Sequence, residues 1–191
     1  MKKNLGPQMA VYPMPVLMIA TYGEDGTVDV MNAAWGMICA ENKIALFLDE
    51  EHKTTKNILA RKAFTVSLAD KAHMDAADFF GMVSGNSVPD KFGRTGYKAL
   101  KSEFVDAPVI DEFPLVMECE LADIIERGNV YAVIGEIKNT AADETVLKAD
   151  GSVDPAKLEA LVFDPFGSGY YTVGEKAGQA WQEGAAFTEK L

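Results

Sequence analysis

The chain has 191 residues, the length of one large domain or two small ones, and we expect a single domain over residues 1–191. Hydrophobic residues make up 48% of it and charged residues 25%, a balance typical of a folded protein and not of a disordered one. The formal net charge of −11 argues against nucleic acid or anionic membranes as general partners, because both require a basic face.

No segment predicts a signal peptide or a membrane span, so we expect a cytoplasmic protein without membrane contact. The two cysteines, Cys39 and Cys119, have apolar neighbours and are expected to be reduced and buried. The two histidines, His52 and His73, lack the i, i+4 spacing of a helical zinc site. We therefore expect no metal site.

The first predicted element is a β-hairpin. Two β-rich runs, residues 16–22 and 27–32, flank Glu24, Asp25 and Gly26. An Asp-Gly pair between such runs is a strong hairpin signal, because glycine adopts the positive φ of the favoured tight turns.

The remaining elements follow in the same style, with strands meeting mainly by hairpins and a few helices packed outside them. We predict strands at 43–48, 64–68, 114–125 and 130–137, helices beginning near residue 54 and at 73–82, and one long loop at 85–96. This order predicts a mainly β protein with peripheral helices, and closing such a sheet into a barrel leaves no exposed edges.

Lysines gather where the first helix is predicted to begin, in the run from His52 to Asn57. Cations at a helix start oppose the helix dipole, whereas an anion is stabilised there by the dipole and the unpaired N–H groups. Lys53 with the hydroxyls of Thr54 and Thr55 therefore suits a terminal phosphate. The alternative is that Thr54 or Thr55 simply caps the helix while the lysines are solvated.

Three further stretches offer contacts to a planar ligand. The run 32–36 combines the amide of Asn32 with small residues and Trp35, although a lone tryptophan is more often a core residue. The loop 84–96 is rich in glycine, hydroxyls and positive charge, and Lys91 either reaches a ligand or is solvated at the surface. Phe163 is a third candidate, with core packing as the alternative.

Common catalytic motifs are missing from the sequence. It contains no G-x-x-x-x-G-K-[ST] phosphate loop and no G-x-S-x-G nucleophile elbow. The run Gly167-Ser168-Gly169 lacks the third glycine of the dinucleotide-binding fold, which argues against a dedicated Rossmann site for a nicotinamide.

Taken together, these stretches resemble the flavin reductase-like family with its FMN-binding split barrel, and especially the flavoredoxin branch. The resemblance rests on the order and spacing of six segments. They are residues 15–21, 30–35, 52–58, 90–96, 107–110 and 118–121.

The resemblance implies an antiparallel split β-barrel and a homodimer with FMN near the subunit interface. It places Asn32, Ala33, Ala34 and Trp35 beside the isoalloxazine ring, and Lys53, Thr54, Thr55 and Asn57 around the phosphate. It also implies that Lys91 approaches the ring or ribityl chain and that Phe163 packs close to the flavin. A further contact near Asn129 or Tyr131 stays open.

In such a protein the flavin performs the redox chemistry, so no catalytic acid or base is required. Two functions remain open from the sequence. The first is an enzyme that takes hydride from NADH or NADPH and reduces an acceptor, and the second is an electron carrier that exchanges electrons with a redox protein. An FMN-binding module without turnover is a third alternative.

Overall fold

A computed structural model describes residues 1–188. Its largest part is a seven-stranded antiparallel sheet with the strand order β3-β2-β6-β9-β10-β5-β4. The strands of this sheet are β2 (Leu17–Tyr22), β3 (Val28–Ala33), β4 (Gly36–Ala40), β5 (Lys43–Asp49), β6 (Ala63–Leu68), β9 (Leu115–Arg127) and β10 (Val130–Ala142).

The two edge strands of this sheet, β3 and β4, are consecutive in the chain and are joined by Ala34 and Trp35 alone. A sheet whose edges are joined so closely has to curl round until the edges meet. Gly36 of β4 demonstrates the closure, because a Cβ atom there would lie 2.6 Å from a methyl carbon of Leu17 in β2. The sheet is therefore a split barrel, and its split lies between β3 and β4.

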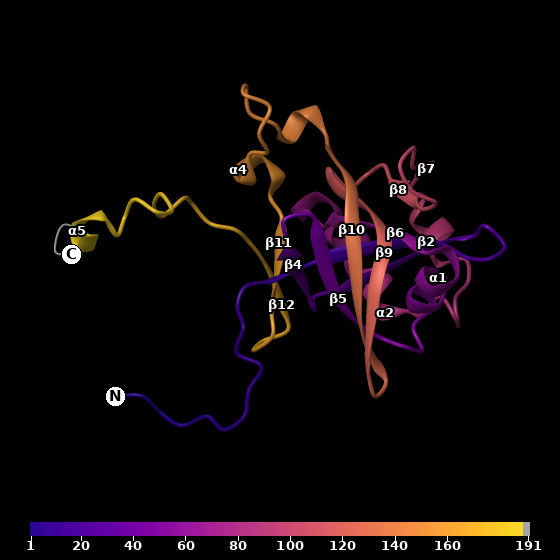
Figure 1. Cartoon of the computed structure of the whole chain (residues 1–191), viewed down its shortest axis with the longest axis horizontal. Helices are drawn as coiled ribbons and strands as arrows, with labels where there is room; N and C mark the ends of the chain where they lie inside the picture. Colours follow the sequence, from indigo (N-terminus) through magenta and orange to yellow (C-terminus); the bar gives the residue numbers. More distant parts are fainter. Residues whose placement is uncertain (189–191) are drawn as a thin grey trace.

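Two small sheets and helices α1 to α4 lie around the barrel, whereas α5 lies at the end of the C-terminal tail, away from it (Figure 1). The small sheets are β1-β11-β12, made of Met14–Pro15, Leu161–Asp164 and Gly169–Thr172, and β7-β8, made of Ala99–Lys101 and Pro108–Ile110. The helices are α1 (Lys53–Arg61), α2 (Met74–Met82), α3 (Lys91–Thr95), α4 (Pro155–Leu158) and α5 (Ala185–Thr188), with short 3-10 turns at Lys71–His73 and Glu144–Val146.

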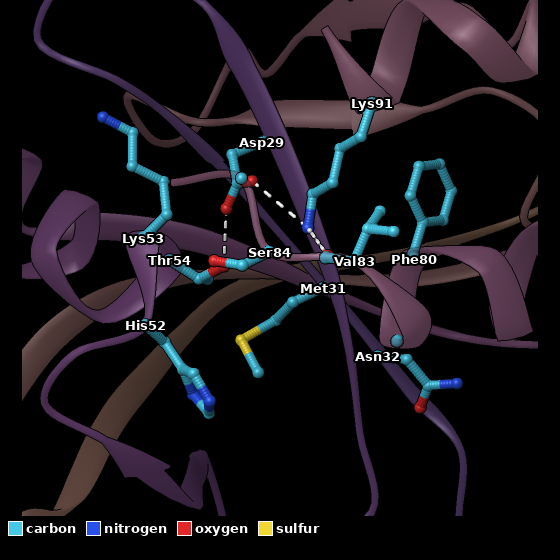
Figure 2. Close-up of a pocket in the computed structure, with 12 residues that line it drawn as sticks. Asp29, Met31, Asn32, His52, Lys53, Thr54, Phe80, Val83, Ser84 and Lys91 are labelled. Atoms are coloured by element: carbon cyan, nitrogen blue, oxygen red, sulfur yellow. Dashed lines mark hydrogen bonds and ion pairs between the residues drawn. The ribbon is translucent and has the colours of Figure 1, made fainter. Parts of the chain in front are cut away.

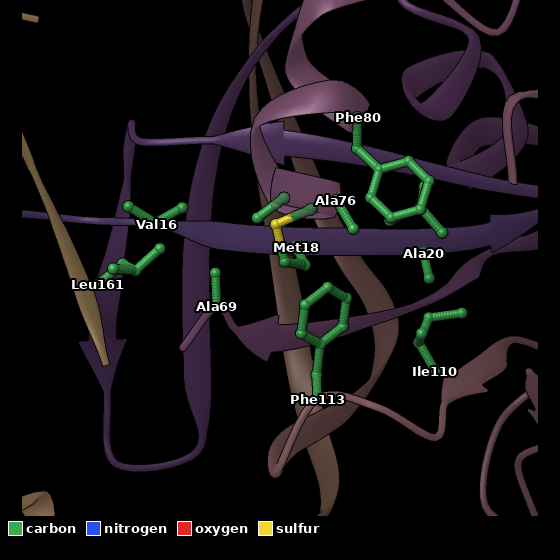
Figure 3. Packing of buried hydrophobic residues seen from close by; sticks show 11 residues of the cluster. Val16, Met18, Ala20, Ala69, Ala76, Phe80, Ile110, Phe113 and Leu161 are labelled. Carbon is green, nitrogen blue, oxygen red and sulfur yellow. The ribbon is translucent and has the colours of Figure 1, made fainter. Parts of the chain in front are cut away.

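Strand β2 is buried on both faces because it separates two hydrophobic clusters. Its residues Leu17 and Ile19 join an inner cluster with Phe64, whereas Met18 and Ala20 pack in an outer cluster. Figure 3 shows the outer cluster, in which Met18 and Ala20 of β2 lie near α2 and the ring of Phe113. Its members are Val16, Met18, Ala20, Val30, Ala69, Ala76, Ala77, Phe80, Ile110, Phe113 and Leu161.

The structure confirms the predicted hairpins and the mainly β character. The expectation of one long loop at 85–96 is wrong, because α3 forms inside it. An ion pair between Arg94 and Asp90 supports this helix, and Gly96 ends it in the left-handed conformation. Cys119 is buried as expected, but Cys39 is exposed because it lies on the edge strand β4.

Both ends of the described chain run away from the barrel on the side of β11 and β12 (Figure 1). Residues 1–13 and 171–185 are exposed. None of the helices in residues 1–188 combines the length and hydropathy that crossing a membrane requires.

Candidate functional site

Three neighbouring cavities lie along β3, and Asn32 lines all of them. The first, of about 170 Å³, lies between β3, the start of α1 and the segment that follows α2 (Figure 2). The second, of about 320 Å³, lies at the split of the barrel, and the third, of about 280 Å³, lies between β3, α2 and β12. We call them the anion cavity, the split cavity and the side cavity.

The anion cavity is open to the N-terminus of α1. His52 is the N-cap residue of this helix, its side chain makes no capping hydrogen bond, and the first turn holds no acidic residue. Thr54 and Thr55 lie inside the helix, so the alternative that one of them caps it is wrong. The first N–H groups of the helix and its positive dipole end are therefore available to an anion.

Asp29 lines the anion cavity and contacts two other residues that line it, Thr54 and Lys91 (Figure 2). The hydroxyl of Thr54 donates a hydrogen bond of 2.6 Å to Asp29 Oδ2, and Lys91 Nζ lies 3.4 Å from Asp29 Oδ1. Lys91 Nζ also donates to the carbonyl of Val83 at 3.3 Å. The Lys91 side chain is 3% exposed, so the alternative that it is solvated at the surface is wrong.

The turn after α2 closes the cavity from the other side. A Cβ atom on Gly85 would collide with Asp29 Oδ1, so this turn approaches Asp29 more closely than a residue with a side chain could. The side-chain amide of Asn86 donates a hydrogen bond of 2.8 Å to the carbonyl of Glu51, just before α1. This bond ties the turn to the helix start, and Ser84 lines the cavity between them.

The split cavity is apolar. Ala33 and Ala34 supply small side chains, and the two large aromatic rings of Trp35 and Phe163 supply flat surfaces. Trp35 is 56% exposed, so it is not the core residue that its type usually predicts. The other residues that line the cavity are Met9, Met31, Asn32, Phe47, Leu48, Asp49, His52, Val130 and Pro165.

The side cavity contains a short chain of hydrogen bonds. Tyr170 donates its hydroxyl proton to Asp78 Oδ1 at 2.9 Å and accepts from Asn32 Nδ2 at 3.4 Å. Burial and the neighbouring Asp78 carboxylate raise the pKa of Tyr170 above its ordinary value. The same nitrogen of Asn32 donates to the carbonyl of Ala77 at 3.0 Å.

The structure brings together eight of the ten residues that the sequence predicts for the site. These eight line the anion cavity or the split cavity, and they are Asn32, Ala33, Ala34, Trp35, Lys53, Thr54, Lys91 and Phe163.

Thr55 and Asn57 lie apart from these two cavities. Thr55 lines none of the three cavities along β3, and its hydroxyl donates to the carbonyl of Asp49 at 2.8 Å. Asn57 donates to Thr21 Oγ1 at 2.9 Å and lines a separate surface cavity beside Lys53. Their predicted contacts with a phosphate therefore remain predictions of the resemblance.

Asn129 and Tyr131, which lie in the hairpin of β9 and β10, also have partners within the chain. Asn129 donates to Asp49 Oδ2 at 3.0 Å, and the Tyr131 hydroxyl lies 3.5 Å from Glu50 Oε2. The residue between them, Val130, lines the split cavity.

Sequence reasoning missed several residues of the site. Asp29 is one of them. Its sequence signal was a charged residue between two valines of the first predicted hairpin. Ser84 and Gly85 belong to the loop 84–96, which is rich in glycine and hydroxyl groups. No local pattern distinguishes these two residues from their neighbours in the loop. Asp78 and Tyr170 carried no sequence signal, because the bonds that join them cross from α2 to β12.

The fold and the site define the class of protein, which is a split-barrel protein of the flavin reductase type. The family model described as "Flavin reductase like domain" matches residues 9–169, and the chain belongs to this family.

Two solved structures are similar over nearly their whole length. The flavoredoxin of Desulfovibrio vulgaris (Miyazaki F) is 37% identical with a TM-score of 0.91, covering 96% of this chain and 100% of that one. The flavoredoxin of Methanosarcina acetivorans is 25% identical with a TM-score of 0.89, covering 98% and 99%.

A curated relative, described as an uncharacterized protein of Aeropyrum pernix, is 30% identical over 133 residues. The match covers 69% of this chain and 50% of the relative, so the chain spans about half the length of that protein.

Proposed function

We propose that the protein binds FMN along β3 and uses it to pass electrons from a donor to an acceptor, as an oxidoreductase of the flavoredoxin or flavin reductase type. The observation that carries the proposal is a cationic helix start and an apolar aromatic cavity that meet at the same residues. Met31, Asn32 and His52 line both the anion cavity and the split cavity.

The anion cavity suits the phosphate of FMN. An uncapped helix N-terminus without acidic residues attracts an anion, and Lys53, which lines this cavity, adds a positive charge. Asp29 is the one carboxylate among the lining residues, and Thr54 and Lys91 occupy its two oxygens. The buried cation thereby offsets the charge that would otherwise repel a phosphate.

The split cavity suits the isoalloxazine ring. Small side chains at Ala33 and Ala34 allow a planar group to approach the backbone of β3, and Phe163 offers an aromatic face. When FMN is bound, the flavin supplies the redox chemistry, while the protein orients it and restricts access.

We propose that a second copy of the chain covers the open side of the split cavity. Edge strand β4 and its neighbours expose large apolar side chains next to the cavity, and exposed apolar edges favour association. Trp35, Met37, Ile38 and Phe47 are 56%, 66%, 54% and 45% exposed. This face, which we call the β4 face, would place FMN near a homodimer interface.

A second candidate function is an electron carrier that receives electrons from a redox protein. The specific support is the similarity of at least 25% identity to two structures named flavoredoxin, over 96% or more of this chain. The two candidates share the site and differ in the donor.

The test of the cofactor is a fluorescence titration of the purified protein with FMN. Lys53→Ala should weaken FMN binding roughly tenfold. A hydrogen bond to a charged group contributes about 1.5–3 kcal/mol, and the lower end applies because the Lys53 side chain is partly exposed. Lys56→Ala is the matched control, since Lys56 lies one turn on and pairs with Glu51 at 2.6 Å. Equal losses in both variants, or no FMN binding by the unaltered protein, would refute the proposed site.

The test of the donor follows in the absence of oxygen. Bleaching of the flavin absorbance within seconds of adding NADH or NADPH would support the enzyme. Reduction by dithionite or a reduced ferredoxin, but not by either nicotinamide, would support the carrier.

A further inference from the structure

The side-chain amide of Asn32 has a nitrogen and an oxygen, and the nitrogen is hydrogen-bonded within the protein. Its nitrogen faces two oxygens, the carbonyl of Ala77 at 3.0 Å and the hydroxyl of Tyr170 at 3.4 Å. A backbone carbonyl can only accept a hydrogen bond, so the Asn32 atom that faces Ala77 has to be the nitrogen and not the oxygen.

Tyr170 reinforces this orientation because its only proton is used elsewhere. The hydroxyl donates to Asp78 Oδ1 at 2.9 Å, and a carboxylate is an acceptor only. The Tyr170 oxygen is therefore left as an acceptor, and it too selects the nitrogen of Asn32. A tyrosine hydroxyl is protonated at neutral pH, and the upward shift of the Tyr170 pKa acts in the same direction.

With both N–H groups directed to Ala77 and Tyr170, the amide has only its oxygen Oδ1 to offer to a ligand. Asn32 lines all three cavities along β3, so its side chain borders the space in which we propose that the flavin lies. We propose that Tyr170 and Asp78 are positioning residues that make Asn32 present a hydrogen-bond acceptor to an N–H group of the bound flavin ring.

This inference rests on the proposed function and makes it more specific. The oxidised isoalloxazine ring carries one N–H group, at N3, and the anionic form of the two-electron-reduced ring carries a second at N5. An acceptor binds either of these groups and repels the carbonyl oxygens of the ring. Asn32 thus sets which edge of the flavin lies against β3.

The first test needs no flavin. Protein labelled with ¹⁵N-asparagine gives a side-chain amide signal for Asn32, identified by its loss in Asn32→Asp. In Tyr170→Phe, one of the two amide protons of Asn32 should exchange with solvent at least threefold faster. Tyr171→Phe is the matched control, because Tyr171 is 52% exposed and is not hydrogen-bonded to Asn32 in the described structure.

Two substitutions of Asp78 test the same hydrogen bonds, so that the exchange experiment does not depend on whether Tyr170→Phe folds. Asp78→Asn retains an oxygen that accepts the Tyr170 proton, so the exchange of Asn32 should stay near that of the unaltered protein. Asp78→Leu removes the acceptor and frees the hydroxyl to donate, so it should reproduce the effect of Tyr170→Phe. Unchanged exchange in both Tyr170→Phe and Asp78→Leu would overturn the proposal.

The second test measures FMN binding and the midpoint potential in the same variants. Tyr170→Phe and Asp78→Leu should raise the Kd for FMN about three- to tenfold, the usual effect of one neutral hydrogen bond. Equal losses for oxidised and reduced FMN, with an unchanged potential, assign the acceptor to N3–H. A shifted potential assigns it to N5–H.

An unchanged Kd together with an unchanged potential would overturn the contact with the ring. That result differs from a failure of the proposed function, in which the unaltered protein itself binds no FMN while the amide exchange still responds to Tyr170→Phe.

Discussion

The two ends of the site are built differently. At the anion cavity, three polar side chains are buried and already paired within the chain, because Asp29 contacts both Thr54 and Lys91. At the split cavity, Trp35, Phe47 and Val130 are partly exposed, and the next strand presents apolar side chains to solvent. The first end is complete in one chain, whereas the second has an open apolar side.

This difference teaches which interactions hold the site before any ligand arrives. Buried ion pairs are fixed by the fold and are costly to break on one side only. Exposed apolar surface contributes to stability only when something covers it. Substitutions at the two ends should therefore affect different properties, stability at the anion cavity and association at the β4 face.

The largest expected effect is at Lys91. Lys91→Met should lower the free energy of unfolding by about 3–5 kcal/mol, because it leaves the Asp29 carboxylate buried without its cation. Urea denaturation followed by circular dichroism measures this change. The double variant Lys91→Met with Asp29→Asn should recover most of the loss, and a double variant no more stable than Lys91→Met would contradict the role of the pair.

A smaller effect is expected at Gly85. Gly85→Ala should lower stability by about 1–3 kcal/mol, the usual cost of overpacking, because the new Cβ atom collides with the fixed Asp29 carboxylate. FMN affinity should fall with it, since the turn has to move away from the cavity. Gly93→Ala in helix α3 is the control, because an added Cβ atom there would project into open space. Equal stability of the two variants would show that the turn yields freely.

The smallest effect on stability, but a large one on assembly, is expected on the β4 face. Met37→Glu should change the free energy of unfolding by less than about 0.5 kcal/mol, because Met37 is 66% exposed in the single chain. Sedimentation velocity should nevertheless show a shift from dimer to monomer, with weaker FMN binding.

Leu100→Glu provides the matched change on a remote surface, since Leu100 is 49% exposed on β7. If Met37→Glu and Leu100→Glu sediment alike, the β4 face is not the interface between two copies of the chain.

Local patterns predicted much of the fold. The Asp-Gly turn specifies the first hairpin through residues that are neighbours in sequence, and the hairpin of β9 and β10 is likewise local in sequence. Strand β4 was not predicted, because four of its five residues are exposed and its sequence shows no alternation between core and solvent. Helix α3 is five residues long and contains a glycine, so its local propensity is weak.

The site was predictable where one segment carries it. The lysine-rich helix start and the run 32–35 each place several site residues in consecutive positions, and both line the cavities. The burial of Lys91 was not predictable, because its partner Asp29 lies in a distant strand. The pairing of Tyr170 with Asp78 is likewise a property of how β12 packs beside α2.

The two-residue connection between β3 and β4 also limits the width of the split cavity. Three Cα–Cα steps separate Ala33 from Gly36, and a fully extended chain reaches at most about 3.6 Å per step. The ends of the two strands therefore cannot move farther apart than about 11 Å. Each residue inserted beside Trp35 would lengthen this tether by up to about 3.6 Å, so the length of the connection sets how wide a ring the split can admit.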